Sequence, residues 1–288
     1  MGPNDLWSAW VWSPFITVPL ALSAIWYAIG LQALWRASAR GRGVRAWEAA
    51  CFGAGWLVLA LALVSPIHPL GEVLFSAHMV QHELMMVVAA PLLVLGRPLV
   101  PFVWALSPQW RRAVGDAARA PGFRATWNGL TRPSTTWFLH AAAIWIWHAP
   151  LLYQATLDNA LLHTLQHVSF LATALLFWWS VLRGARLGYG ASVAYLFATM
   201  LHTSALGVVL AFASSLWYPA YAATTTRWGL TPLDDQQLGG LIMWIPGGVS
   251  YLVASLVLVA RWMRESESRA ELREEVAARA AVAQWRLS

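Results

Sequence analysis

Seven apolar stretches, each near the length of about 20 residues that a helix needs to cross a bilayer, limit this chain to very few folds. They lie near residues 14–35, 46–64, 74–95, 134–152, 160–182, 191–216 and 236–262. The 288 residues are 59% hydrophobic and only 11% charged, and the mean hydropathy is +0.54, which excludes an ordinary soluble domain. Because backbone polar groups must be satisfied inside hydrocarbon, the sequence predicts an all-α, polytopic membrane bundle with seven transmembrane helices.

The basic residues are distributed unevenly between the two sides of this bundle. All 19 are arginines, and they gather after the first, third, fifth and seventh apolar stretches. The opposite set of connections, with the N-terminus included, carries only Arg227. By the positive-inside rule we expect the N-terminus outside and the C-terminus in the cytoplasm. The first apolar stretch lacks a basic segment before it, so we expect a retained span and no cleavable signal peptide.

The same pattern predicts the domain organisation. A transmembrane domain occupies residues 1–262, including a cytoplasmic loop at 97–133, and a helical cytoplasmic tail follows at 263–288. Part of the loop is expected to be an interfacial helix, because several apolar residues share one helix face. These residues are Leu99, Phe102, Val103 and Leu106.

Two pairs of histidines are the main functional candidates. His78 and His82 lie in the third apolar stretch, and His163 and His167 lie in the fifth. At a spacing of i, i+4 both rings of a pair project from one helix face, which suits two ligands for one metal. Both stretches run inward, so all four rings lie within roughly 5–10 Å of the outer boundary. Ionisable groups at membrane depth indicate function, and we predict that the pairs form one site.

The other histidines are weaker candidates. His148 lies near the outer end of the fourth stretch, at the level of the two pairs, whereas His68 lies in an outer loop where solvation is the alternative. His202 lies near mid-membrane and His140 lies deeper. For these last two residues, a hydrogen bond between helices is the alternative to a functional role.

Methionines and carboxylates add to the candidate site. Met79 and Met86 offer thioethers that suit Cu(I), although packing is their alternative role. The single cysteine, Cys51, excludes an internal disulfide and a CxxC metal clamp. Glu83 lies at lipid depth, where a partnership with a histidine would relieve its desolvation, and Asp235 is either a helix N-cap or a group that recruits cations.

Several ordered blocks between about residues 50 and 260 resemble a known family. The blocks are HMVQHELMMVVAAPLLVLGRPL, WIWHAPLLYQATLDNALLHTLQHVSFL, MLHTSALGVVLAFA and WGLTPLDDQQLGGLIMWIPGG. Together they are similar to the CtaG-type assembly factors of caa3-type cytochrome c oxidase. The resemblance implies a multi-pass protein of the bacterial inner membrane that is needed for active oxidase and helps to deliver copper to its binuclear centre. The site residues that it implies are His78, His82, His148, His163, His167 and His202.

The combined prediction is an assembly factor, not an enzyme, that binds Cu(I) transiently through these histidines, with Met79 or Met86 as a soft ligand. Its expected partners are cytochrome c oxidase subunits, a copper donor protein and the lipid bilayer, and no nucleic acid. One alternative is a haem-binding membrane cytochrome or haem-handling protein with bis-histidine ligation. A second alternative is a purely structural chaperone in which the histidines form hydrogen bonds between helices.

Overall fold

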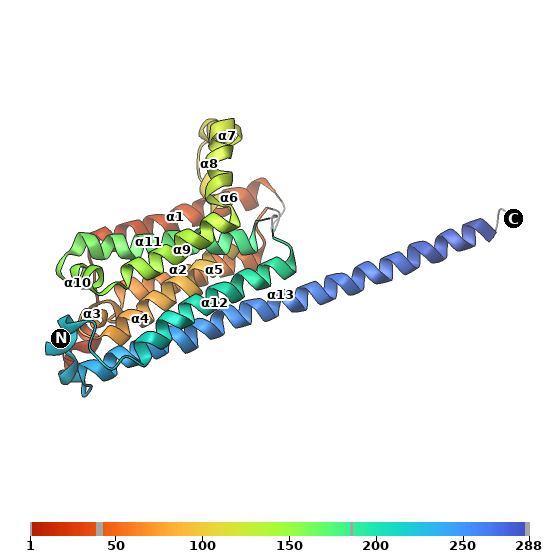
Figure 1. Cartoon of the computed structure of the whole chain (residues 1–288). Helices are drawn as coiled ribbons and strands as arrows, with labels where there is room; N and C mark the ends of the chain where they lie inside the picture. The colour runs from red at the N-terminus through yellow and green to blue at the C-terminus, as the bar shows by residue number, and fades with distance from the viewer. Residues whose placement is uncertain (1, 39–42, 185–186, 286–288) are drawn as a thin grey trace.

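The computed structural model describes residues 2–38, 43–184 and 187–285, and all regular structure in them is helical (Figure 1). This confirms the predicted all-α class. The first half contains η1 (Pro3–Ser8), α1 (Pro14–Ala37), α2 (Ala46–Val64), α3 (Ile67–Gly71), α4 (Phe75–Glu83), η2 (Leu84–Ala89), α5 (Ala90–Leu95), α6 (Leu99–Trp104), α7 (Pro108–Arg119) and α8 (Pro121–Leu130). The second half contains α9 (Pro133–Trp147), α10 (Pro150–Asp158), α11 (Ala160–Leu182), α12 (Tyr189–Ala211), η3 (Pro219–Ala223), η4 (Thr225–Trp228) and α13 (Pro232–Trp285).

Six helical segments within the described residues are long and apolar enough to cross a membrane, which supports a multi-pass membrane protein. They are α1, α2, the continuous segment Phe75–Leu95, α11, α12 and the part of α13 within Pro232–Ala277. The stretch that we predicted as the fourth span forms α9, which has 15 residues and is about 22 Å long at 1.5 Å per residue. The count of seven spans and the predicted orientation therefore remain predictions.

The early end of α9 has a local cause. Ala149 precedes Pro150 and adopts an extended backbone, with φ −61° and ψ 126°. The proline ring disfavours a helical conformation at the preceding residue, so the chain turns and α10 starts anew at Pro150. This turn leaves His148 at the end of α9, facing the bundle interior.

Glycines bring two of the helices into backbone contact. A Cβ atom on Gly240 of α13 would lie 2.4 Å from the backbone nitrogen of Ala211 on α12, and one on Gly207 of α12 would lie 2.8 Å from the carbonyl oxygen of Gly240. Such close approach between membrane helices requires small residues at the interface. Of this pair, α13 in turn packs against α4 along one side of the bundle (Figure 1).

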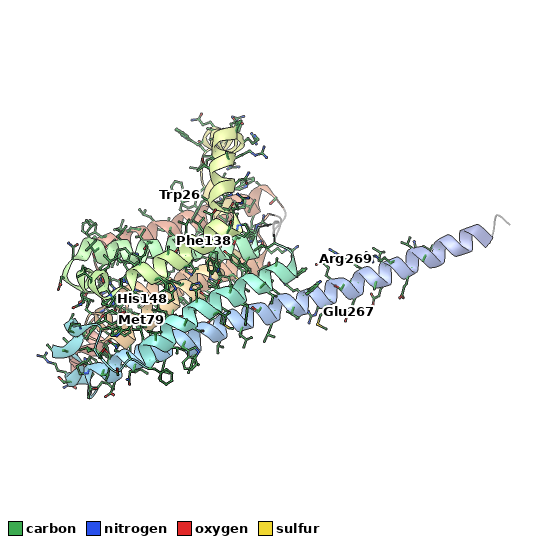
Figure 2. All side chains as sticks on the ribbon, in the orientation of Figure 1. Trp26, Met79, Phe138, His148, Glu267 and Arg269 are labelled. Atoms are coloured by element: carbon green, nitrogen blue, oxygen red, sulfur yellow. The ribbon has the colours of Figure 1, made fainter. Side chains whose placement is uncertain are left out.

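The predicted loop forms three helices, and the predicted helical tail continues the last span without a break. α6 packs against α1, where the Trp26 indole donates a hydrogen bond to the Phe102 carbonyl at 3.0 Å. The Phe102 ring packs against those of Tyr27 and Phe52, so this side chain faces the bundle. α7 and α8 project from the bundle and expose Trp110 and Phe123, as interfacial helices do (Figure 1). The predicted boundary at 262/263 falls inside α13, a single helix of 54 residues whose far end leaves the bundle (Figure 2).

The candidate residues gather at one end of the bundle. α4 and α11 begin there and α9 ends there, close to α3 and α10, whereas the tail of α13 leaves from the opposite end (Figure 1). The arginine-bearing ends of α2, α5 and α11 lie at the tail end. The two ends therefore carry different chemistry, histidines at one and arginines at the other.

Candidate metal centre

Histidines from four helical segments converge at this end of the bundle. The i, i+4 spacing in α4 leaves the ring centroids of His78 and His82 4.3 Å apart, and the same spacing in α11 leaves those of His163 and His167 4.4 Å apart. The two pairs face each other, with 5.3 Å between the His82 and His167 centroids and the same distance between those of His78 and His163. His148 joins from the end of α9, with its ring centroid 6.2 Å from that of His82.

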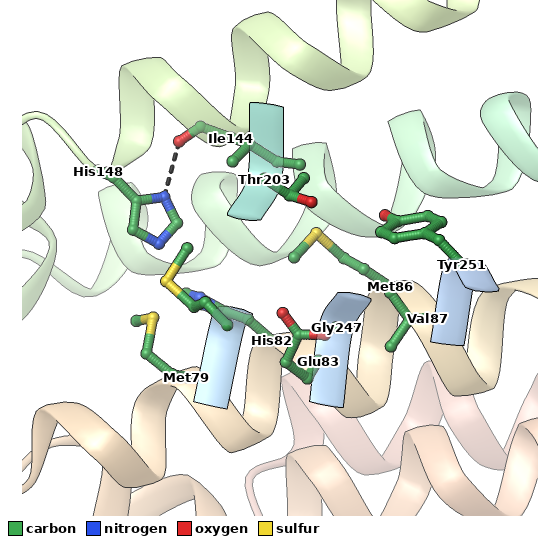
Figure 3. A pocket seen from close by; sticks show the side chains of 11 residues that line it. Met79, His82, Glu83, Met86, Val87, Ile144, His148, Thr203, Gly247 and Tyr251 are labelled. Carbon is green, nitrogen blue, oxygen red and sulfur yellow. Dashed lines mark hydrogen bonds between the residues drawn. The ribbon is translucent and has the colours of Figure 1, made fainter. Parts of the chain in front are cut away.

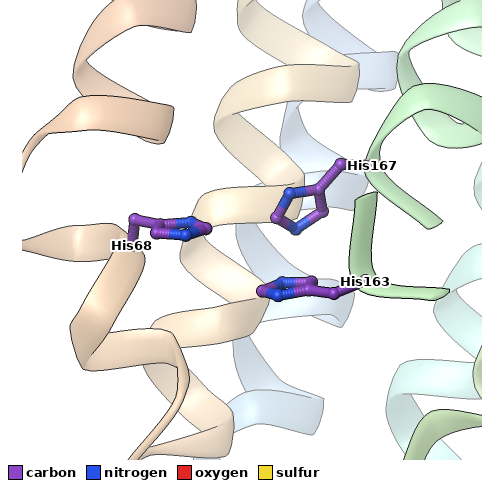
Figure 4. Close-up of side chains that lie close together, drawn as sticks. All are labelled: His68, His163 and His167. Carbon is purple, nitrogen blue, oxygen red and sulfur yellow. The ribbon is translucent and has the colours of Figure 1, made fainter. Parts of the chain in front are cut away.

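Two overlapping triads have the spacing of metal ligands. In the inner triad, ligand atoms of His78, His82 and His167 all lie within 4.8 Å of one another, and all three residues are buried. In the outer triad, the same limit holds for His68, His163 and His167, whose rings face one another (Figure 4). Metal–imidazole bonds are about 2.0–2.1 Å long, so a modest contraction would place either triad around one ion.

Backbone carbonyls fix the tautomers of two rings. The Nδ1 atom of His78 lies 3.2 Å from the Gly71 carbonyl oxygen, and that of His148 lies 2.7 Å from the Ile144 carbonyl oxygen (Figure 3). A carbonyl oxygen only accepts, so each neutral ring carries its proton on Nδ1 and keeps a lone pair on Nε2. This is the orientation that a histidine needs in order to ligate a metal through Nε2.

The nitrogens that face the cluster lack hydrogen-bond partners among the described residues. The buried atoms concerned are Nε2 of His78, His148, His163 and His167 and both ring nitrogens of His82. An unsatisfied buried polar atom costs about 1–3 kcal/mol, so several of them together are not explained by packing. They also do not form the hydrogen bonds between helices that a purely structural role requires. A bound metal ion would satisfy them.

His140 and His202 lie outside the cluster. Nδ1 of His140 on α9 is 3.1 Å from the Thr173 hydroxyl of α11, and Nδ1 of His202 on α12 accepts a hydrogen bond from the Trp145 indole of α9 at 3.3 Å. Both residues thus form the interhelical contacts that were their alternative role. The structure does not bring His202 to the site in which the resemblance placed it.

His68 belongs to the cluster, although its loop position favoured solvation. The Gln81 amide nitrogen donates one hydrogen bond to the Ala62 carbonyl at 2.8 Å and a second to Nδ1 of His68 at 2.9 Å. Nδ1 therefore accepts, and the neutral ring carries its proton on Nε2. Burial lowers the pKa of His68, which keeps the ring neutral. The signal in the sequence that could have placed His68 here is the short connection between α2 and α4. Since α2 ends at Val64 and α4 starts at Phe75, this connection holds His68 near the start of α4.

A small cavity lies beside His82 and His148, deeper in the bundle (Figure 3). Its volume is about 10 Å³, the room for one water-sized occupant. Three thioethers line it, those of Met79, Met86 and Met243. Met79 and Met86 are also buried in the main apolar core, so the structure gives them both a packing contact and a place beside the histidines.

Glu83 also lines this cavity, and its surroundings differ from our expectation. Among the described residues no histidine donates to its carboxylate, and the buried Oε2 atom has no partner. Gly247 makes room for it, because a Cβ atom there would lie 3.0 Å from Oε2. Directly after Glu83 the helix changes to a π-helical turn, η2, a local feature often found at functional sites.

Polar groups around the cluster hold its backbone in place. The Asp235 carboxylate accepts from the backbone N–H of Phe75 at 2.6 Å and from the Ser76 hydroxyl at 2.5 Å, so it caps α4 and not its own helix. The Tyr221 hydroxyl donates to the Gly71 carbonyl at 3.0 Å, and the Tyr218 hydroxyl donates to the His148 carbonyl at 2.8 Å. Asp235 is therefore a capping residue, and these contacts position the segments that carry the histidines.

Comparisons with known proteins identify the family of this chain. A family model described as cytochrome c oxidase caa3 assembly factor matches residues 25–265. An uncharacterized protein of Mycobacterium bovis is 28% identical over 286 residues, covering 93% of this chain and 41% of the relative. An uncharacterized protein of Mycobacterium leprae is 28% identical over 239 residues, covering 76% of this chain and 35% of the relative. The chain thus spans less than half the length of these relatives. No solved structure matches the chain.

Proposed function

The chain belongs to the caa3-type cytochrome c oxidase assembly factor family, and from this premise we propose that its histidine cluster binds Cu(I) transiently for delivery to the haem–copper centre of the oxidase. One observation carries the proposal. Buried imidazole nitrogens from α4, α9 and α11 meet at one place and lack hydrogen-bond partners among the described residues. A copper ion, as cargo, would supply the missing partner to several of them at once.

The inner triad of His78, His82 and His167 is the proposed resting site. Its ligand atoms lie within 4.8 Å of one another, and the Gly71 carbonyl already orients His78 with its Nε2 lone pair free. Neutral imidazoles and thioethers suit a soft monovalent cation, and the cavity lined by Met79 and Met86 adjoins this triad through His82. The methionines favour Cu(I) over Zn(II) in this proposal.

His68 has a different role in the proposal. Because Gln81 donates to its Nδ1, His68 presents an N–H group and not a lone pair on its other nitrogen. Its ring stacks on that of His163 with centroids 5.4 Å apart. His68 would ligate through Nε2 only after its proton moved to Nδ1 and the Gln81 amide turned its oxygen towards it. We therefore assign the resting ligands to α4 and α11 and place His68 at the outer margin.

The geometry favours a bare ion over haem. The cavity that adjoins the cluster has a volume of only about 10 Å³. A porphyrin between two axial imidazoles needs far more space than this.

The proposed partners are a copper donor that loads the site and an oxidase subunit that receives the ion, each by exchange of ligands around copper.

The proposal is tested in cells that depend on this factor for their oxidase. His82→Ala and His167→Ala variants should remain in the membrane but lower the ratio of copper to haem in the purified oxidase, as measured by elemental analysis and optical spectra. His140→Ala removes a buried histidine outside the cluster and is the matched control. Normal copper together with lost haem would favour a haem-handling role instead.

A further inference from the structure

A second polar pocket lies at the opposite end of the bundle, where the arginines gather. Its volume is about 420 Å³, and it is formed by the start of α2, the ends of α5 and α11, the start of α12 and the middle of α13. Four guanidinium groups line it together with one carboxylate. The charged residues are Arg45, Arg97, Arg183, Arg261 and Glu48.

The single carboxylate is already paired. Glu48 is only 4% exposed, and its Oε1 atom lies 3.3 Å from the Arg183 guanidinium and 3.9 Å from that of Arg97. Arg183 also donates to the Leu95 carbonyl at 2.5 Å and so satisfies the end of α5. Among the described residues, no carboxylate lies within ion-pair distance of the Arg45 or Arg261 side chain. The pocket therefore keeps a net positive charge that an anion would balance.

The backbone beside this pocket is unusual. Arg97 has φ 51°, and it is the one residue other than glycine with a positive φ in the described part of the chain. Non-glycine residues adopt this conformation only where the surroundings enforce it, often at ligand sites. Here it follows Gly96, where a Cβ atom would lie 2.5 Å from the Phe52 side chain. The close packing of α5 on α2 therefore fixes the backbone at this turn, and Arg97 lines the pocket.

The pocket lies at the ends of spanning segments, the level at which lipid headgroups would meet the bundle. Trp47, which is 45% exposed, and Tyr189 stand at its rim, and such residues anchor helices at the membrane interface. Leu182 and Leu258 form apolar parts of its wall. An anion in this pocket would thus contact both guanidinium groups and hydrocarbon.

An apolar groove lies next to the pocket along α11, towards the middle of that helix. Its volume is about 320 Å³, and its lining includes Leu175 and Trp179 of α11, Val94 of α5 and Trp127 of α8. Leu175, Trp179 and Leu182 share one face of α11 at i, i+4 and i+7, so the groove continues along the helix face that begins in the arginine pocket. A free phosphate ion would make no contact with such an apolar groove, whereas the acyl chain of a lipid would fill it.

We propose that the arginine pocket binds the phosphate of an anionic phospholipid, with an acyl chain of that lipid in the adjoining groove. Basic pockets between membrane helices recognise lipid headgroups in this way. The proposal does not depend on copper binding, because none of its residues touches the histidine cluster. It gives the arginines of these helix ends a second role beside setting orientation.

The test measures lipid binding by the purified full-length protein with native mass spectrometry. Dioleoyl phosphatidylglycerol and dioleoyl phosphatidylcholine are titrated in mixed micelles against the wild type and the double variant Arg45→Gln/Arg261→Gln. Arg183 and Arg97 are left unchanged because they hold Glu48. The control, Arg273→Gln/Arg279→Gln, removes the same charge from the tail of α13. At about fivefold per arginine, the pocket variant should bind phosphatidylglycerol about 25-fold more weakly, and the control should bind as the wild type.

Competition distinguishes the possible sources of the anion. Excess inorganic phosphate or glycerol phosphate should fail to displace phosphatidylglycerol, because neither occupies the groove. Equal binding of the two lipids by the wild type would overturn the proposal without recourse to any variant. Displacement by inorganic phosphate would identify a free-anion site, and displacement by polyglutamate would identify a site for an acidic peptide; either result would also overturn it.

Discussion

The carboxylate of Asp235, on α13, accepts a hydrogen bond of 2.6 Å from the backbone N–H of Phe75, the first residue of α4. The same carboxylate accepts from the backbone N–H of Ser76 at 3.1 Å. The first N–H groups of a helix have no partner within it, so this contact across helices caps α4. Since α4 carries His78 and His82, Asp235 sets the position of two of the three histidines of the inner triad.

Asp235→Asn should therefore destabilise the protein. The amide keeps the size of the carboxylate but loses its charge and one acceptor, and the cost should be about 1–3 kcal/mol in the apparent free energy of unfolding. Asp234→Asn is the matched control, because Asp234 is exposed and bonds only locally with Thr231. Thermal melting in detergent measures both variants. Equal melting temperatures for the two would show that the cap is unimportant.

Gly239→Ala should disturb the same helix from another direction. A Cβ atom at Gly239 would lie 2.3 Å from a ring carbon of Phe75 and 3.2 Å from Cγ of Met79, so α4 must shift. Overpacking of this kind costs about 1–3 kcal/mol. Gly53→Ala is the control, since nothing lies within 4 Å of the added atom in α2. Thermal melting should show a loss for the first variant only, and a stable Gly239→Ala protein would mean that α4 is less tightly held than the structure indicates.

Helical spacing and span counting predicted the core of the candidate site. The i, i+4 spacing fixes which residues of one helix share a face, and counting from the span ends fixes their depth, so His78, His82, His163 and His167 were placed together correctly. Depth does not fix the rotation of a helix about its axis. The family resemblance, and not the depth argument, implied His202 as a site residue, and the structure places its ring beside that of Trp137, with 5.2 Å between centroids.

Contacts between segments that lie far apart in the chain could not be predicted from the sequence. A carboxylate at the start of α13 predicts an N-cap of its own helix, and only the tertiary structure shows that Asp235 caps α4. Pro150 in the sequence indicates a break in the helix. How short this break leaves α9 also depends on where α9 starts, which the sequence does not fix. The family resemblance, by contrast, rested on ordered motifs and was confirmed.

The orientation of the bundle is a further prediction. Reporter fusions after Ser288 and within α7 at Gly115 should both report the cytoplasm, because the arginine-rich connections lie on that side. A fusion near Asn159, between α10 and α11, should report the outer side. An outer signal from Ser288 would reverse the orientation and place the histidine cluster near the inner surface.

The methionines beside the cluster should tune affinity for Cu(I). Replacing both Met79 and Met86 by Leu keeps the volume nearly constant, so stability should change by less than about 1.5 kcal/mol while Cu(I) affinity falls. Met263→Leu, at an exposed position, is the control. Competition with a Cu(I) chelator under reducing conditions gives the affinity, and thermal melting gives the stability. Unchanged affinity in the double variant would leave Met79 and Met86 with a packing role alone.

Cu(I) binding by the inner triad is the central claim, and titration of the purified full-length protein tests it most directly. The protein in detergent is titrated with Cu(I) against a chromophoric chelator, and bound copper is counted by elemental analysis. The wild type and His140→Ala should retain copper, whereas His78→Ala, His82→Ala and His167→Ala should each weaken binding, because each removes one of the three grouped ligands. Equal copper retention by the wild type and all three cluster variants would contradict the account.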